Sequence, residues 1–296
     1  MTDIDILKTR TVQRIVPARR TLEGEGFEVR RALPAPGIEA VGPFIFVDHF
    51  GPVDYAPGEA KGAPNHPHRG FETLTYMVEG GGLHRDSLGN VSRIGAGEAQ
   101  WMRAGSGVLH DEGADEAMRR DGGRSHGVQF WINLPRGRKM SPPAYAAVTR
   151  DRIPELPLGG GSLRLIAGTL EAHRGPVETF ANPWLAFLAL PEGNTATVAA
   201  DPAELAIYVL SGEVSVDGDR VVGEGQLAIL TSGEVVRLRA LGTARAFLLG
   251  GDPLDAPIRR WGPFVMNSDQ ELQQAMRDFQ AGLFGQIPSS LPGVLS

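Results

Sequence analysis

The sequence predicts an all-β protein that is built from two similar halves. Glycine and proline account for 39 and 22 of the 296 residues, well above the usual combined share of roughly 12%. Such a composition favours many short strands joined by tight turns. Short apolar segments that end at a glycine recur along the chain, as is typical of strands. Because one pattern from the first half returns in the second, we expect a duplicated domain.

Two pairs of strand-like segments carry this repeat. The segment 74–80 resembles 205–212 at an offset of 132, with a tyrosine and the final glycine in register, and 97–105 resembles 225–233 at an offset of 128. The intervening hairpin is therefore shorter in the second copy. Two merely similar hairpins remain an alternative, because turn glycines and apolar strands are common in all-β chains.

Two motifs in the first copy place ligand-type side chains two positions apart. His66 and His68 form one pair, and His110 and Glu112 form the other. Residues two apart on a strand share one face, so neighbouring strands would direct three imidazoles and a carboxylate to a common point. Nitrogen and oxygen ligands of this kind suit a divalent transition metal. The chain has no cysteine, which excludes thiolate ligands and disulfides.

The second copy lacks these ligand types. The residues aligned with the four candidate ligands are all apolar: Val198, Ala200, Leu238 and Ala240. Glu72 alone keeps its equivalent, Glu204, which suggests a structural or coincidental glutamate. We therefore expect one metal ion per chain, in the N-terminal half.

Composition also limits the partners that the protein can have. A formal net charge of −6 gives no general attraction to a polyanion, so direct nucleic-acid binding is not expected. No apolar run reaches the roughly 18 residues that a membrane helix needs. Residues Met1 to Asp5 also lack the basic start of a secretory signal. These observations make a cytoplasmic location, away from membranes, the expectation.

Three regions are expected along the chain. Residues 1–136 would form an N-terminal domain that contains the metal site. Residues 137–161 are rich in proline, glycine and charge and are expected to be a linker. Residues 162–296 would form a C-terminal domain without metal ligands that ends in a helix.

The C-terminal helix has a recognisable start. Ser268, followed by Glu271 three residues later, makes a capping box. Apolar residues then follow at helical spacing: Leu272, Ala275, Met276 and Phe279. The mixed charges in 115–121 are instead expected to form a solvated loop.

Several sequence blocks resemble the pirin family of bicupins. The blocks are HPHRGFET at 66–73, HRDSLG at 84–89, QWMRAGSG at 100–107, HDE at 110–112, QFWINLP at 129–135 and WGPFVMN at 261–267. The resemblance runs from about residue 43 to 285. It implies two cupin (jelly-roll β-barrel) domains facing each other, with iron in the first barrel and an apolar second barrel. It also implies that the metal ligands are His66, His68, His110 and Glu112.

The resemblance further implies a function. Bacterial pirin-like proteins are similar to quercetin 2,3-dioxygenases, in which a flavonol-like aromatic substrate and dioxygen react at the metal. Fe(II) is the expected ion, with Mn, Ni, Cu, Co or Zn as alternatives. Glu112 is the candidate catalytic residue, as a general base for the flavonol hydroxyl. The alternatives are a non-enzymatic, iron-binding redox sensor that regulates a protein partner, as a transcription cofactor would, or a cupin enzyme with another substrate.

Three further polar residues keep open roles. Spacing alone would allow Glu72 as the carboxylate ligand, since ordinary cupins use a glutamate four residues after the second histidine, but the pirin pattern favours Glu112. For His84, which lies two residues from Asp86, an orienting or turn role is favoured over ligation. For His126, packing or a local hydrogen bond is favoured.

Overall fold

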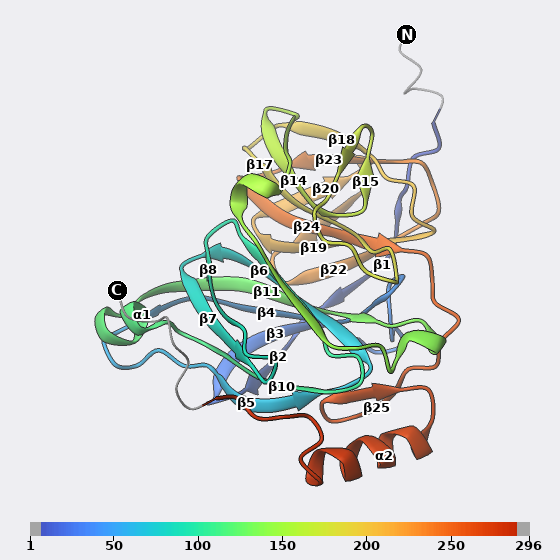
Figure 1. Cartoon of the computed structure of the whole chain (residues 1–296). Helices are drawn as coiled ribbons and strands as arrows, with labels where there is room; N and C mark the ends of the chain where they lie inside the picture. The colour runs from blue at the N-terminus through green and yellow to red at the C-terminus, as the bar shows by residue number, and fades with distance from the viewer. Residues whose placement is uncertain (1–6, 289–296) are drawn as a thin grey trace. The chain divides into compact units, whose positions relative to one another are not determined.

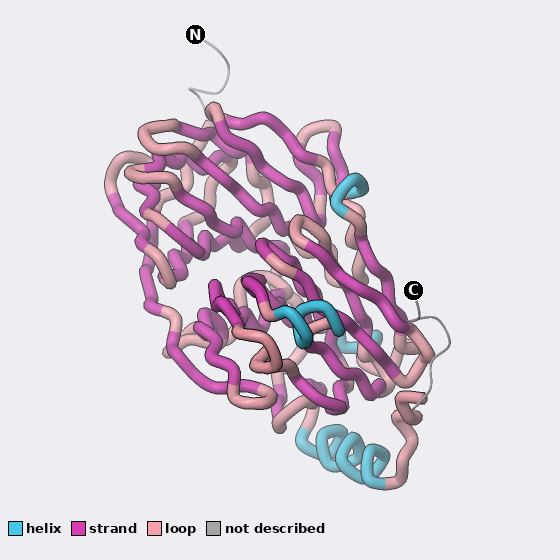
Figure 2. The backbone as a smooth tube through the Cα atoms, turned by 90° about the vertical axis from the view of Figure 1, so that its left-hand side faces the viewer, coloured by secondary structure: helices cyan, strands magenta, loops and turns pink. Residues whose placement is uncertain are grey.

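The structure is a computed structural model that describes residues 7–288, so Met1 to Asp5 lie outside the described residues. Strands make up most of the described chain and helices are few (Figures 1 and 2). The all-β class with a C-terminal helix is thus confirmed. Among the described residues, no helix is long and apolar enough to cross a membrane.

The chain divides into two compact units. One contains the four candidate ligands and comprises, within the described chain, residues 20–29, 47–150 and 255–288; we name it the histidine unit. The other comprises residues 7–19, 30–46 and 151–254, and we name it the apolar unit. This division differs from the boundaries 1–136, 137–161 and 162–296 that the sequence suggested.

The histidine unit is built around one large and one small sheet. In spatial order, the seven-stranded sheet contains β12 (Ala144–Val148), β9 (Ala99–Arg103), β6 (Phe71–Glu79), β11 (Gly123–Asn133), β4 (Phe44–Tyr55), β3 (Phe27–Leu33) and β2 (Arg19–Glu23), the last three being shared with the apolar unit. The four-stranded sheet contains β5 (Ala63–His68), β10 (Val108–Gly113), β7 (Gly81–Asp86) and β8 (Val91–Gly95).

The apolar unit repeats this plan. Its seven-stranded sheet contains β1 (Val12–Pro17), β22 (Gln226–Leu230), β19 (Glu204–Ser211), β24 (Ala244–Gly251), β17 (Trp184–Leu190), β14 (Gly161–Ala167) and β13 (Glu155–Leu158). Its four-stranded sheet contains β18 (Thr195–Ala199), β23 (Val235–Ala240), β20 (Glu213–Val216) and β21 (Arg220–Gly223). A small hairpin adds β15 (Thr169–Leu170) and β16 (His173–Arg174).

The strand orders confirm the duplication. The order β5-β10-β7-β8 is matched by β18-β23-β20-β21, and β9-β6-β11 is matched by β22-β19-β24. The repeated glycines have a physical reason: Gly80 and Gly212 both have positive φ, and a Cβ atom at either would lie within 2.4 Å of a backbone carbonyl oxygen. Only glycine fits such a turn.

The ligand positions are apolar in the second copy, as the alignment indicated. The four aligned residues, Val198, Ala200, Leu238 and Ala240, are buried in the apolar core of their unit. Strand pairing nevertheless changes two equivalences. His110 pairs with His66, whereas Leu238 pairs with Ala196, so the counterpart of His66 is Ala196 and not Val198. Val108 pairs with His68, whereas Val236 pairs with Val198. The counterpart of His68 is therefore Val198 and not Ala200, and either residue is apolar.

Two parts of the chain differ from expectation. The predicted linker 137–161 carries β12, which pairs with β9, and β13, which pairs with β14. It also contains the short 3-10 helix η3 (Arg150–Arg152), and a second one, η2 (Arg136–Arg138), spans its start. The segment that was expected to be a linker thus contains paired strands, because strand pairing can overcome an unfavourable local composition. The predicted charged loop contains helix α1 (Glu116–Asp121), capped by the side chain of Asp115 and without buried residues.

The C-terminal helix forms as predicted but belongs to the histidine unit. Helix α2 (Asp269–Gln280) begins after Ser268, whose side chain accepts a hydrogen bond from the backbone N–H of Glu271. It follows the hairpin of β25 (Arg259–Trp261) and β26 (Phe264–Met266) (Figure 1). Leu272 and Ala275 pack with Phe264 of that hairpin. The apolar face of α2 therefore anchors the C-terminal segment within the unit that holds the histidines.

Candidate metal centre

Two paired strands bring the three candidate histidines together. His66 and His68 lie on β5, and His110 lies on the antiparallel neighbour β10 directly opposite His66. The alternation along β5 places His66 and His68 on one face, as expected. The register then shifts between His110 and Glu112, which pairs with Ala63.

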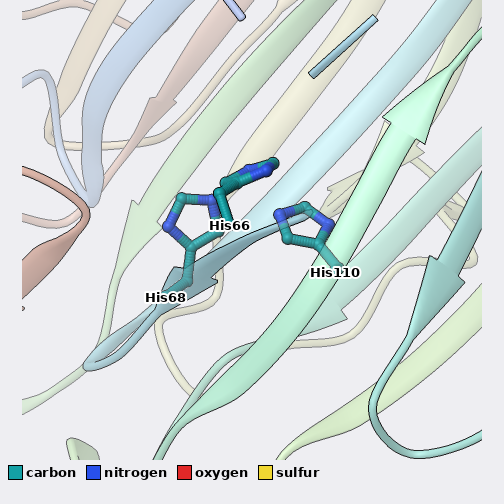
Figure 3. Close-up of side chains that lie close together, drawn as sticks. All are labelled: His66, His68 and His110. Carbon is teal, nitrogen blue, oxygen red and sulfur yellow. The ribbon is translucent and has the colours of Figure 1, made fainter. Parts of the chain in front are cut away.

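The three imidazoles form one cluster (Figure 3). Ligand atoms of His66, His68 and His110 lie within 4.8 Å of one another. The ring centroids of His66 and His110 are 4.2 Å apart, and that of His68 lies 4.8 Å from each. Figure 3 shows the rings converging from the two strands. This part of the predicted ligand set is thus brought together in space.

Backbone carbonyls orient two of the rings. Nδ1 of His66 lies 2.9 Å from the carbonyl oxygen of Pro64, and Nδ1 of His68 lies 3.2 Å from that of Pro263. A carbonyl oxygen only accepts hydrogen bonds, so each Nδ1 is the donor. In a neutral imidazole this tautomer leaves the lone pair on Nε2. Both rings can therefore offer Nε2 to an ion.

The third ring supplies the test of whether a metal would fit. His110 is fully buried, and neither of its ring nitrogens has a hydrogen-bond partner. Unsatisfied buried polar atoms are costly and rare. Burial, together with the nearby His66, also lowers the pKa of His68 and His110 well below 6.5. Since metals bind neutral imidazole, these side chains fit a divalent ion.

Glu112 lies in an adjacent cluster that shares His110. Ligand atoms of His84, His110 and Glu112 lie within 4.8 Å of one another, but Glu112 does not join His66 and His68 in a group of that size. One carboxylate oxygen accepts a hydrogen bond from Nε2 of Gln100, and the other accepts one from Nε2 of Gln129 at 2.6 Å. The carboxylate is thus held beside the three-histidine cluster by two amides.

The imidazole of His84 is held by Asp86 and Tyr145. Its Nε2 lies 3.1 Å from a carboxylate oxygen of Asp86, and its ring stacks on Tyr145 with centroids 4.3 Å apart. Burial raises the pKa of Asp86, but hydrogen bonds from His84 and Asn90 outweigh burial, and the pKa is lowered. With Nε2 donating to Asp86, a neutral His84 keeps its lone pair on Nδ1, a buried atom without a hydrogen-bond partner. This geometry suits metal ligation as well as the orienting role predicted for His84.

The remaining sequence candidates lie apart from these clusters. Glu72 is fully buried on β6 and belongs to neither group of possible ligands among the described residues. His126 is buried, with Nε2 2.8 Å from Nε2 of His49 and Nδ1 3.6 Å from Glu79. The local hydrogen bond predicted for His126 is therefore present.

Sequence reasoning missed the two glutamines that hold Glu112. Gln100 and Gln129 occupy interior strands of the large sheet, β9 and β11. A buried polar residue between apolar neighbours on such a strand needs a partner, which was the available signal. An aromatic wall beside the site was also missed: Phe71 and Trp131 stack with centroids 4.2 Å apart, and both rings contact His68.

Fold and site together define a class of protein. It has two jelly-roll barrels of the cupin type, one with a cluster of histidines on its strands and one filled with apolar side chains. A chain of two such barrels with one polar site has the architecture of a bicupin.

The chain belongs to the pirin family. The family model for pirin matches residues 26–132, and that for the pirin C-terminal cupin domain matches residues 185–285. A pirin-like protein from Caulobacter vibrioides is 40% identical, over 94% of this chain and 100% of the relative. Mouse pirin is 34% identical, over 90% of each chain.

A solved structure extends the similarity to three dimensions. The crystal structure described as quercetin 2,3-dioxygenase from Acinetobacter baumannii superimposes with a TM-score of 0.89 and 34% identity. It covers 95% of this chain and 100% of that one. The two-barrel fold implied by the sequence is thus confirmed.

Proposed function

We propose that this protein is a metal-dependent dioxygenase of the quercetin 2,3-dioxygenase type, acting on a flavonol-like aromatic substrate with dioxygen. The observation that carries the proposal is the convergence of the imidazoles of His66, His68 and His110. Of these, His110 is buried and neither of its ring nitrogens has a hydrogen-bond partner. The similarity to the Acinetobacter baumannii dioxygenase structure, at 34% identity, supports the reaction type.

In this proposal, one ion per chain, Fe(II) by expectation, is held by His66, His68 and His110, with Glu112 as the fourth ligand. When bound, the ion supplies Lewis acidity toward the substrate hydroxyl and the redox chemistry that dioxygen requires. Four protein ligands leave room for substrate on an ion that accepts six, and such open positions distinguish catalytic from structural sites. The orphaned nitrogens of His110 are the most direct support for this ligand set.

Glu112 also has the geometry of a general base. Each carboxylate oxygen accepts one amide hydrogen bond, from Gln100 or Gln129. A carboxylate offers about four lone-pair directions, so each oxygen keeps one for the ion or for the proton of a flavonol hydroxyl. The two amides fix where that lone pair points, which positions Glu112 for proton transfer.

The surroundings of His68 suit an aromatic substrate. Phe71 and Trp131 form an apolar wall beside the imidazole, at centroid distances of 4.9 and 5.1 Å. An apolar wall with few polar groups is typical of small-molecule sites, and it excludes water from a reactive centre.

Oxygen uptake with quercetin tests the proposal. Protein reconstituted anaerobically with Fe(II) should consume oxygen, release carbon monoxide and lose both activities in the His66→Ala variant. If protein that holds one iron per chain consumes no oxygen, the dioxygenase proposal fails. The non-enzymatic, iron-binding regulator would then be pursued by partner capture that depends on the iron oxidation state.

A further inference from the structure

The turn that follows His68 is held by a segment from the far end of the chain. Pro263 lies between β25 and β26, and its carbonyl oxygen is the partner of His68 Nδ1 at 3.2 Å. His68 has only 3% of its surface exposed, so water does not readily replace this acceptor. The proton on Nδ1, and with it the lone pair on Nε2, therefore depends on where Pro263 lies.

Backbone contacts join the same two segments. The N–H of Val265 donates to the carbonyl oxygen of Arg69 at 3.0 Å, and Arg69 forms a parallel bridge with Phe264. Gly70 has positive φ, and a Cβ atom there would lie 2.0 Å from the Val265 carbonyl oxygen. The approach is thus so close that position 70 has to be glycine.

Buried Lys139 bridges the turn after His68 and strand β26. Its Nζ donates to the carbonyl oxygens of Gly70 and Val265, at 2.8 and 2.9 Å, and to the side chain of Asn133. An ammonium group has three donors, so all of them are used. One buried lysine thereby links the histidine turn, β11 and β26.

Arg69 connects this arrangement to helix α2. Its side chain, 5% exposed, forms an ion pair with Asp278 at 2.7 Å and donates through Nε to the Ser106 carbonyl oxygen at 2.8 Å. The guanidinium also lies over the ring of Phe284, 4.6 Å from the centroid. An arginine with hydrogen bonds, an ion pair and a ring contact is held in one orientation.

We infer that the C-terminal segment 259–285 is a positioning element of the metal centre, acting through the Pro263 carbonyl on His68 and held in place by the pair of Arg69 and Asp278. The inference rests on the proposed metal site but not on the dioxygenase reaction. Partners that orient ligating histidines typically contribute about 10- to 100-fold to metal affinity. Asp278, which touches no candidate ligand, is therefore expected to influence metal binding.

Metal affinity of an Asp278→Asn variant tests this inference. Co(II) affinity, measured by competition with a chelator, should fall by up to about 10-fold, the lower end of what a direct partner of a ligand contributes, because Asp278 acts only through Arg69. Asp278→Glu should restore most of it. The matched control is Asp269→Asn, which removes the same charge from an exposed position in the first turn of the same helix and should leave the affinity unchanged. Thermal unfolding of the metal-free variants reports any general loss of stability.

The tautomer of His68 distinguishes a positioning role of the C-terminal segment from a role in general stability, because a general loss of stability would not change the tautomer. Long-range proton–nitrogen NMR of metal-free, histidine-labelled protein should find the wild-type proton on Nδ1, with the signal assigned by its loss in His68→Gln. Asp278→Asn should populate both tautomers. A wild-type proton on Nε2, or an Asp278→Asn protein with unchanged tautomer and affinity, would overturn the inference. The wild-type spectrum tests the inference even if the variant does not fold. Neither measurement uses quercetin or oxygen, so a failure of the dioxygenase proposal would not affect the result.

Discussion

Gln129 donates a hydrogen bond from Nε2 to a carboxylate oxygen of Glu112 at 2.6 Å. Gln129 also accepts a hydrogen bond from the indole nitrogen of Trp131 at 3.3 Å, so its amide orientation is defined. Because Gln129 and Glu112 lie on different strands, β11 and β10, this contact fixes the carboxylate relative to the large sheet.

Replacing Gln129 by leucine should remove a hydrogen bond that positions the Glu112 carboxylate, while preserving much of the side-chain volume. A hydrogen bond to a charged group contributes about 1.5–3 kcal/mol, so we expect turnover of quercetin to fall roughly 10- to 100-fold. Steady-state kinetics on protein with measured iron content would check this. Unchanged turnover would mean that Gln129 does not position the carboxylate.

The variant Glu112→Gln separates the two proposed roles of this side chain. Loss of a general base typically costs about 10²- to 10⁴-fold in rate, and an amide cannot accept the substrate proton. Turnover should therefore be low even in molecules that retain iron, as measured by metal analysis beside oxygen uptake. Retention of both metal and full turnover would remove the assignment of Glu112 as base.

His110→Ala should abolish metal binding. His110 belongs to both groups of possible ligands, so no alternative site remains among the described residues if it is removed. In the wild type, a free ion at 100 times its dissociation constant should stabilise the fold by about 2.7 kcal/mol. This gain should vanish in His110→Ala but persist in the control His173→Ala, in which an exposed histidine is removed. Metal-dependent stabilisation of His110→Ala would contradict the site.

The metal-free protein should lose stability in acid. Burial lowers the pKa of His68 and His110 well below 6.5 in the folded state, whereas unfolded histidines titrate near 6.5. Below about pH 6.5 the unfolded chain therefore binds more protons, and the free energy of unfolding falls with pH, by up to about 1.4 kcal/mol per unit per histidine. Urea unfolding at several pH values would measure this. The slope should shrink in the double variant His68→Gln/His110→Gln; an equal slope would exclude these residues as its source.

Lys139 should make the free energy of unfolding depend on pH in the alkaline range as well. Burial lowers its pKa from 10.5 to about 7, with Glu271 acting in the opposite direction. Between these values the unfolded chain keeps a proton that the folded chain has released, so stability rises with pH by up to about 1.4 kcal/mol per unit. Lys139→Met should flatten this part of the profile. An identical profile in the variant would show that Lys139 does not titrate in this range.

The candidate histidines could be predicted from sequence because their signal is local. Alternation on a strand is enough to put His66 and His68 on one face, and the absence of ligands from the second copy directed attention to the first. The helix at Ser268 was equally predictable, since a capping box and an apolar face lie within a few turns. The histidine motif and the capping box each depend on residues close together in the chain, and the second copy adds a comparison that needs no knowledge of contacts.

Contacts between distant segments could not be predicted in this way. Nothing near His68 in sequence indicates that the carbonyl oxygen of Pro263 accepts a hydrogen bond from its Nδ1, because the two residues are 195 positions apart. Pairing of the predicted linker through β12 and β13 has the same origin, since pairing depends on which strand edge is available. The structure also places Glu112 with His84 and His110, which spacing alone could not show.

The most direct test of the metal centre is an anomalous difference map from crystals loaded anaerobically with Fe(II). The proposed ligand set predicts one iron peak per chain, within bonding distance of Nε2 of His66 and of His68 and of one ring nitrogen of His110, with none in the apolar unit. A well-occupied iron bound elsewhere, or histidines that remain unligated in crystals saturated with Fe(II), would contradict it.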